Sequence, residues 1–264
     1  MSDTNNNLTM NYPKYLYKYI GFDMFVNMIQ RSSLTFSLFG TWDDLHEYDP
    51  VIYFINNSNN NKLINQATLC QMFKTYCQCW TELNESDAMW RIYSYGNKSI
   101  RIKAKTENLL KITDNLEIRK VIYSDSLYEQ IDKSIKKNDP IQLYAIKRKA
   151  FSHEKEYRLI DLYRFGDKED AKKHIIALNY YLTEFKDLDC KMDDIEKEIE
   201  NNLKLINVGK YKINHKDIHV DSIENLIEGV MVNPFSPKWY IETVKKYCEI
   251  NGIRFDGISQ LYAK

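Results

Sequence analysis

Short segments with alternating apolar and polar positions, or rich in aromatic and β-branched residues, recur along the chain. Successive side chains of a strand point to opposite faces, so this pattern predicts β-strands. The predicted strands are 15–19, 34–38, 76–82, 99–104, 118–123, 154–161, 227–232 and 255–261. We expect the strand at 99–104 to lie at a solvent edge.

Other segments repeat their apolar residues at intervals of three and four, which predicts helices. The predicted helices are 22–30, 67–75, 87–93 (capped by Asp87), 106–110, 126–136, 140–150 and 238–249. Strands and helices alternate in mixed order. The sequence therefore predicts an α+β fold with mixed, mostly antiparallel short-strand sheets and flanking helices.

The 264 residues are enough for one large domain. Residues 1–13 are polar and rich in asparagine, which indicates a flexible N-terminal lead-in. We expect a single domain over residues 14–264. At about 167–206 the chain becomes highly charged, with apolar residues four apart (Ile195, Ile199 and Leu203), which predicts a helical insertion.

Charge and cysteine content narrow the class of protein. Lys+Arg and Asp+Glu both number 37, so no overall charge draws the chain to nucleic acid or membranes. The five cysteines show no Cys-x-x-Cys spacing, which favours reduced thiols and predicts no metal site. No signal peptide and no membrane-length apolar run occurs, so we expect a cytoplasmic protein.

The segment 151–161 contains the most suggestive chemistry. In an extended strand Glu154, Glu156 and Arg158 would share one face, while Tyr157 and Leu159 face the other. Two carboxylates this close repel each other unless a cation or a proton intervenes, which is typical of functional sites. The alternative is an ordinary solvated strand with cross-strand ion pairs.

Several blocks of the sequence together resemble a widespread bacterial domain-of-unknown-function family. The blocks, in chain order, are Leu16-Tyr17-Lys18-Tyr19, the strand around Phe36-Ser37, Trp42-Asp43-Asp44, Cys79-Trp80-Thr81-Glu82, Met89-Trp90-Arg91-Ile92-Tyr93, Glu154-Lys155-Glu156-Tyr157-Arg158, and the stretch from Gly229 to Ser259. The resemblance spans roughly residues 15–261 without the helical insertion.

This layout is in turn similar to the ADP-ribosyltransferase fold, whose members split NAD and transfer ADP-ribose. Such enzymes carry a basic residue on an early strand, a Ser or Thr on a middle strand and a Glu on a later one. The resemblance implies that Glu156 is the catalytic carboxylate, assisted by Glu154 and supported by Thr81. It implies NAD as substrate and a protein or nucleic-acid acceptor.

The same resemblance assigns cofactor-binding roles. Lys18 and Arg158 would contact the phosphates, with Arg91 nearby, and Tyr17 or Trp90 would stack on nicotinamide. Each of these residues also has a structural alternative. Lys18 could be a solvent-facing strand lysine, Trp90 a core residue, and the two arginines partners of neighbouring acids. Thr81 could simply be a good β-former.

Two other functions compete with a toxin-like or antiphage transferase. One is a non-catalytic sensing or adaptor module with a partner chain in a defence or toxin system. The other is a nucleic-acid-processing enzyme, for which the Glu-x-Lys at 184–186 is the only indication. Phosphate-loop and dinucleotide fingerprints are absent from the sequence.

Overall fold

The computed structural model describes residues 12–42, 44–57, 71–72, 74–114, 116–137, 139–164, 166 and 215–263. Nearly all of the predicted lead-in, most of the predicted helix 67–75, the insertion at 167–206 and the Glu-x-Lys at 184–186 lie outside these residues. None of the helices within this part of the chain combines the length and apolar character that crossing a membrane requires.

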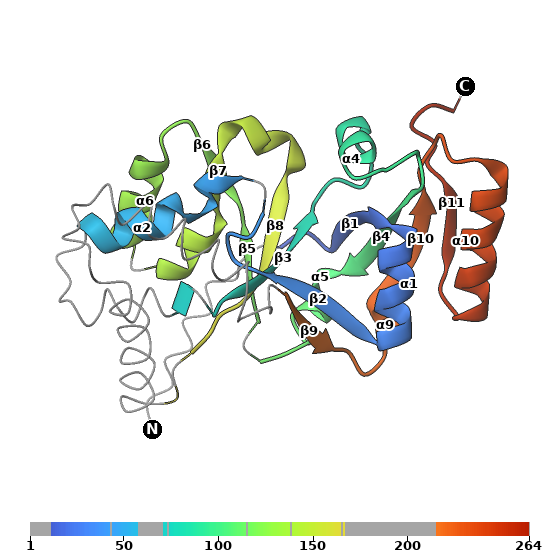
Figure 1. The fold of residues 1–264 in the computed structure, drawn as a ribbon, viewed down its shortest axis with the longest axis horizontal. Coiled ribbons are helices and arrows are strands. Elements are labelled where there is room, and N and C mark those ends of the chain that lie inside the picture. Colours follow the sequence, from blue (N-terminus) through green and yellow to red (C-terminus); the bar gives the residue numbers. More distant parts are fainter. Residues whose placement is uncertain are drawn as a thin grey trace, which may run out of the picture.

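Strands and helices alternate as expected for an α+β fold (Figure 1). The strands are β1 (Tyr15–Gly21), β2 (Ser33–Leu38), β3 (Tyr76–Thr81), β4 (Ser99–Lys105), β5 (Leu116–Lys120), β6 (Ile122–Ser124), β7 (Ile146–Arg148), β8 (Glu156–Asp161), β9 (His215–His219), β10 (Ile227–Val232) and β11 (Phe255–Ile258). The helices are α1 (Phe22–Arg31), α2 (Asp49–Asn57), α4 (Asp87–Ile92), α5 (Thr106–Leu109), α6 (Leu127–Lys136), α9 (Ile223–Leu226) and α10 (Lys238–Ile250). Three 3₁₀ segments are η1 (Leu45–Tyr48), η2 (Pro140–Ala145) and η3 (Lys149–Glu154).

The main sheet forks at β3. One edge of β3 pairs with β8 along its whole length, and β8 pairs in turn with β5. The other edge is shared, because β2 pairs with the first residues of β3 and β1 meets only its last residue, Thr81. One arm continues from β2 to β9, and the other runs from β1 through β4 and β10 to β11. All pairings are antiparallel except β10–β11 and the separate pair β6–β7.

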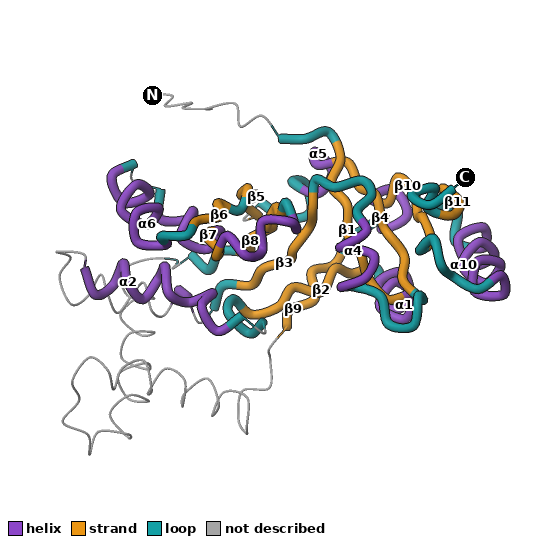
Figure 2. Tube along the Cα trace, turned by 90° about the horizontal axis from the view of Figure 1, so that it is seen from above, coloured by secondary structure: helices purple, strands orange, loops and turns teal. Residues whose placement is uncertain are grey.

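Apolar side chains cover the two faces of this sheet with separate clusters. On one face, Leu16 and Ile102 from the strands pack with Phe25 of α1 and Val244 of α10. Figure 2 accordingly shows α1 and α10 on the same side of β1, β4 and β10. A second cluster joins β3 and β8 to α2, α6 and η2, and includes Cys77, Ile131 and Ile160. The opposite faces of β8 are therefore both buried.

Several sequence predictions were wrong in detail. Residues 140–150 form two 3₁₀ segments joined through β7 rather than one helix, and the predicted strand 118–123 is divided between two sheets. Strand β4 lies between β1 and β10 instead of at a solvent edge. The cap of α4 is Ser86, whose hydroxyl accepts from the Met89 amide, and not Asp87. Helix α2 and strand β9 were not predicted.

Candidate functional site

The fork places three of the predicted site residues in one row. Tyr17 of β1 lies opposite Thr81 of β3, and Thr81 lies opposite Glu156 of β8. Directly opposed residues point to the same face of a sheet, so the three side chains lie on one face. At β8 this face is covered by the cluster of α2, α6 and η2, which leaves little solvent at Glu156, whereas Tyr17 on β1 is partly exposed.

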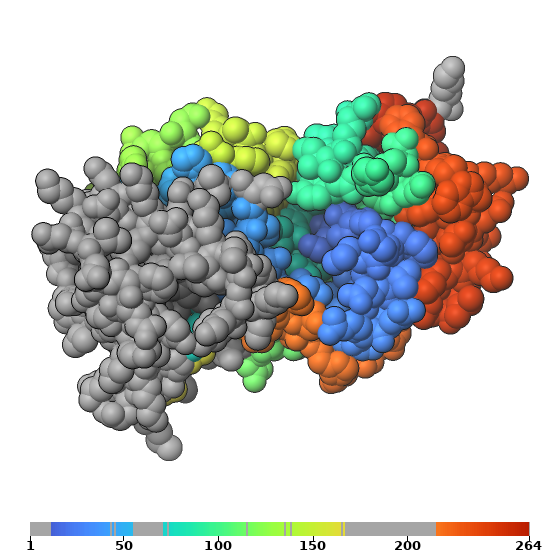
Figure 3. All heavy atoms as spheres, viewed as in Figure 1, coloured from blue at the N-terminus to red at the C-terminus, as the bar shows by residue number. Residues whose placement is uncertain are grey.

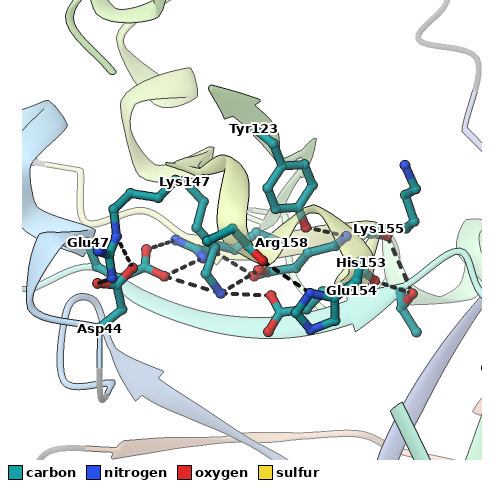
Figure 4. Close-up of polar contacts among 12 residues, drawn as sticks. Asp44, Glu47, Tyr123, Lys147, His153, Glu154, Lys155 and Arg158 are labelled. Carbon is teal, nitrogen blue, oxygen red and sulfur yellow. Dashed lines mark hydrogen bonds and ion pairs between the residues drawn. The ribbon is translucent and has the colours of Figure 1, made fainter. Parts of the chain in front are cut away.

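Lys147 of β7 joins the two predicted carboxylates. Its ammonium lies 2.8 Å from Glu154 Oε2 and 3.4 Å from Glu156 Oε2 (Figure 4). The side chains of Lys147, Glu154 and Glu156 are 11%, 10% and 4% exposed. The interpretation of this segment as a solvated strand is therefore wrong, because β8 and its flanking glutamate are buried.

The two glutamates do not reach Lys147 as neighbours in one strand. Glu154 ends η3, and Lys155 adopts a left-handed conformation with φ of 45° before β8 begins at Glu156. The Thr81 hydroxyl donates to the Glu154 carbonyl at 2.6 Å and accepts from the Leu83 amide at 3.0 Å. Thr81 thus fixes the turn that brings Glu154 beside Glu156, rather than contacting either carboxylate.

Arg158 binds Glu156 from the other side. Its Nε donates to Glu156 Oε1 at 2.9 Å, and its Nη1 donates to Glu47 Oε2 at 2.9 Å and to the Tyr144 carbonyl at 2.8 Å. The guanidinium also lies 4.6 Å from the centre of the Trp42 ring. Arg158 is fully buried, so its N–H groups donate to acceptors inside the protein.

Together these five ionic side chains form a buried charge cluster. It contains three carboxylates (Glu47, Glu154 and Glu156) and two cations (Lys147 and Arg158), a formal sum of −1. Burial alone would raise the pKa of Glu156, but Arg158 and Lys147 lower it to about 2. Burial lowers the pKa of Lys147, but the three carboxylates outweigh it and raise that pKa above its usual range.

The neighbouring Cys79 is opposite Arg158 in the β3–β8 pair. Burial and the Glu156 carboxylate raise the pKa of its thiol well above the ordinary value. A thiol in this state is protonated at neutral pH, so Cys79 is a weak donor beside Glu156 rather than a nucleophile.

The remaining predicted residues lie apart from the charge cluster. Lys18 reaches into the fork, where its ammonium donates to the Cys79 carbonyl at 2.9 Å, and burial lowers its pKa. Trp90 is 1% exposed and packs edge-to-face on Tyr19, with ring centroids 4.7 Å apart, so its ring belongs to the core. Arg91 is an exposed partner of Asp87 on α4.

Tyr93 connects the cluster with the surface. Its hydroxyl lies 3.4 Å from Glu154 Oε1, and the residue is 41% exposed. It also lines an open hollow of about 540 Å³ between the start of α1 and the segment after α4. These two segments lie side by side in Figure 3, α1 in blue and residues 92–98 in green. Asp23 and Lys98 place one charge of each sign on its wall.

Sequence reasoning missed Glu47, Lys147 and Tyr93 as members of the site. Glu47 belonged to no predicted strand or helix, and Lys147 fell inside the predicted helix 140–150, so neither had a pattern of its own. Residues 89–93, which include Tyr93, form one of the blocks that carry the resemblance to the domain-of-unknown-function family. The sequence therefore did point to this segment. Within the described residues, no group of three or more His, Cys, Asp or Glu side chains could hold a metal ion.

Comparison with known proteins gives one match. Residues 89–159 match a family described as a protein of unknown function (DUF2971), which confirms the expected similarity to a domain-of-unknown-function family. The matched stretch runs from α4 into β8 and includes Tyr93, Lys147, Glu154, Glu156 and Arg158. No curated protein and no solved structure matches the chain.

Proposed function

We propose that the protein is an NAD-dependent ADP-ribosyltransferase with Glu156 as its central carboxylate. The observation that carries this proposal is the row of Tyr17, Thr81 and Glu156 across β1, β3 and β8. An aromatic residue, a hydroxyl and a carboxylate thereby lie on one face of three neighbouring strands, and Lys18 stands within electrostatic reach of Glu156. In this proposal β1, β3 and β8 take the places of the early, middle and later strands of ADP-ribosyltransferases.

The proposed reaction breaks the bond between the ribose and nicotinamide. Nicotinamide leaves with the bonding electron pair, and positive charge develops on the ribose. An ionised Glu156 stabilises that charge and accepts a hydrogen bond from the ribose 2′-hydroxyl. The acceptor then bonds to the ribose carbon, and its proton passes to Glu154 acting as a base. The low pKa of Glu156 keeps this carboxylate ionised at neutral pH.

Access to the carboxylates requires a rearrangement. Both are covered, and Lys147 occupies the space between them. Tyr93 is the neighbour of Glu154 that is open to solvent and lines the hollow. We therefore infer that substrate enters from the hollow, displaces the Tyr93 hydroxyl from Glu154, and draws Lys147 toward a phosphate.

The same geometry favours a second candidate, a non-catalytic sensing or adaptor module. Every member of the charge cluster already has an ionic partner inside the protein, as a purely structural network would. In that case Glu156 would contribute to stability, and a partner chain in a defence or toxin system would bind elsewhere. The two candidates make opposite predictions for NAD turnover.

Incubation with NAD labelled in the adenylate part, with and without cell lysate, tests the proposal. We expect the wild-type protein to release nicotinamide or to transfer label, and Glu156→Gln to do neither. The matched control is Glu242→Gln, an exposed glutamate on α10, which should leave turnover unchanged. Equal thermal unfolding of the variants shows that the folds are intact. If folded wild-type protein neither binds nor consumes NAD, the transferase is refuted and the adaptor module stands.

A further inference from the structure

Strands β1 and β4 carry a regular ladder of tyrosines opposite cations. Alternate residues of a strand share a face, so Tyr15, Tyr17 and Tyr19 of β1 point to the same side as their opposed partners on β4. The opposed pairs are Tyr15 with Lys105, Tyr17 with Lys103, and Tyr19 with Arg101. The intervening residues, such as Leu16 and Ile102, face the apolar core on the other side.

The cations of this ladder lie over the tyrosine rings. Lys103 Nζ is 4.0 Å and Lys14 Nζ is 5.2 Å from the centre of the Tyr15 ring, and Arg101 is 4.9 Å from that of Tyr17. Each such contact between a cation and an aromatic ring is stabilising at an exposed site. A stabilising role alone would be served by one cation for each ring, whereas two cations flank Tyr15.

The ladder is closed at one end and open at the other. At the closed end Tyr19 and Arg101 are buried, and the Tyr19 ring packs on Trp90 of α4. At the open end Tyr15, Tyr17 and Lys103 are partly exposed and Lys14 is exposed. The open end thus presents two aromatic rings and two ammonium groups on a sheet face, and the row of Tyr17, Thr81 and Glu156 continues that face toward the charge cluster.

The charges at the open end do not cancel. Lys105 is paired with Glu228 at 3.1 Å, and Arg101 with Asp256 at 3.0 Å. Lys14 and Lys103 have no carboxylate partner among the described residues. The whole chain is formally neutral, so the positive charge on this face is a local excess and would act over about a Debye length, roughly 8 Å at physiological salt.

We propose that this face, defined by Lys14, Tyr15, Tyr17 and Lys103, binds single-stranded nucleic acid. Unpaired bases stack on exposed aromatic rings, and phosphates bind neighbouring lysines, which is the general chemistry of single-strand recognition on sheets. A duplex keeps its bases stacked internally and cannot use the rings. The inference does not depend on NAD turnover, since it concerns binding alone.

Fluorescence anisotropy of a labelled single strand of about 12 nucleotides, as DNA and as RNA, tests this inference. We expect saturable binding that weakens with salt, and at least tenfold weaker binding for Tyr15→Ala, because one stacking platform is lost. Tyr15→Phe keeps the ring and should bind like the wild type. Lys103→Gln should weaken binding and lower the slope of log affinity against log salt by about one.

Two control variants come from α6, away from β1 and β4 (Figure 1). Tyr128→Ala removes a tyrosine from α6 that is more exposed than Tyr15, at 58%, and Lys133→Gln removes a lysine from the same helix. Neither should change the affinity. The inference is overturned if the wild-type protein does not bind, or if Tyr15→Ala binds as well as Tyr128→Ala. It is also overturned if a duplex or an acidic peptide displaces the strand as well as unlabelled single strand does.

Discussion

Replacing Arg158 by methionine removes one of only two cations from the charge cluster while keeping a side chain of similar length. Arg158 is fully buried and donates to Glu47, Glu156 and the Tyr144 carbonyl. In the variant three carboxylates would face Lys147 alone, and the formal charge of the cluster would change from −1 to −2. We expect a large loss of stability.

The magnitude follows from the burial of the partners. Removing one member of a buried pair leaves an uncompensated charge and costs about 3–5 kcal/mol. A similar change at an exposed pair has little effect on the free energy of unfolding. Because domains are usually stable by about 5–15 kcal/mol, Arg158→Met should remain folded but unfold at a clearly lower denaturant concentration.

Urea unfolding at neutral pH, followed by tryptophan fluorescence, measures this loss. The matched control is Arg164→Met, which breaks an ion pair to Glu117 from a side chain that is 54% exposed. Combining Glu47→Leu with Arg158→Met should cost less than the two single changes together, since the formal charge of the cluster then stays at −1. An unfolding free energy for Arg158→Met within about 1 kcal/mol of the wild type would refute the reasoning, because breaking a buried ion pair costs several times more.

Two further predictions concern acid and a glycine. The pKa of Glu156 is lowered from 4.5 to about 2, so its stabilisation is complete above pH 4.5 and disappears as the pH falls toward 2. The stability difference between wild type and Glu156→Gln should therefore shrink by roughly 3 kcal/mol over this range, and a constant difference in urea titrations would contradict the shift. Gly40 has φ of +78°, and an added Cβ would overlap the Tyr48 ring. Gly40→Ala should lower the free energy of unfolding by about 1–3 kcal/mol or more. Gly96→Ala, at a glycine with φ of +57° and open space around it, should lower it less. Equal losses in thermal melts would show that the contact with the Tyr48 ring is unimportant.

Local patterns predicted most strands correctly, because the apolar residues of β1, β2, β3 and β10 alternate or cluster in ways that only a sheet satisfies. The same reasoning correctly placed Thr81, Glu156 and Arg158 on strands, but it also placed Glu154 on the strand of Glu156, whereas Glu154 ends η3. It failed at residues 140–150. The spacing of apolar residues there predicted a helix, but residues 146–148 form β7 and pair with β6. It also missed α2, although Pro50 and Asp49 are typical of a first helical turn.

The composition of the charge cluster could not be predicted. Glu47 and Arg158 are separated by 111 residues, and nothing in either local sequence distinguishes this pair from a surface pair. Lys147 lies in a stretch with helical spacing of its apolar residues, which is equally compatible with an exposed lysine. Which charges meet depends on how η1 and β7 are folded over β8, and this is a property of the tertiary structure alone.

The two arms of the fork also have a consequence for biosynthesis. Strand β2 is completed on its outer side by β9, and Thr35 bonds Asp217 across 182 residues of sequence. Strand β4 likewise obtains its second neighbour only from β10. While the ribosome is still making the first two hundred residues, both strands present unpaired backbone edges to other chains. Folding of the sheet therefore waits until β9 and β10 have been made, and long-range pairing of this kind is slow and exposed to aggregation.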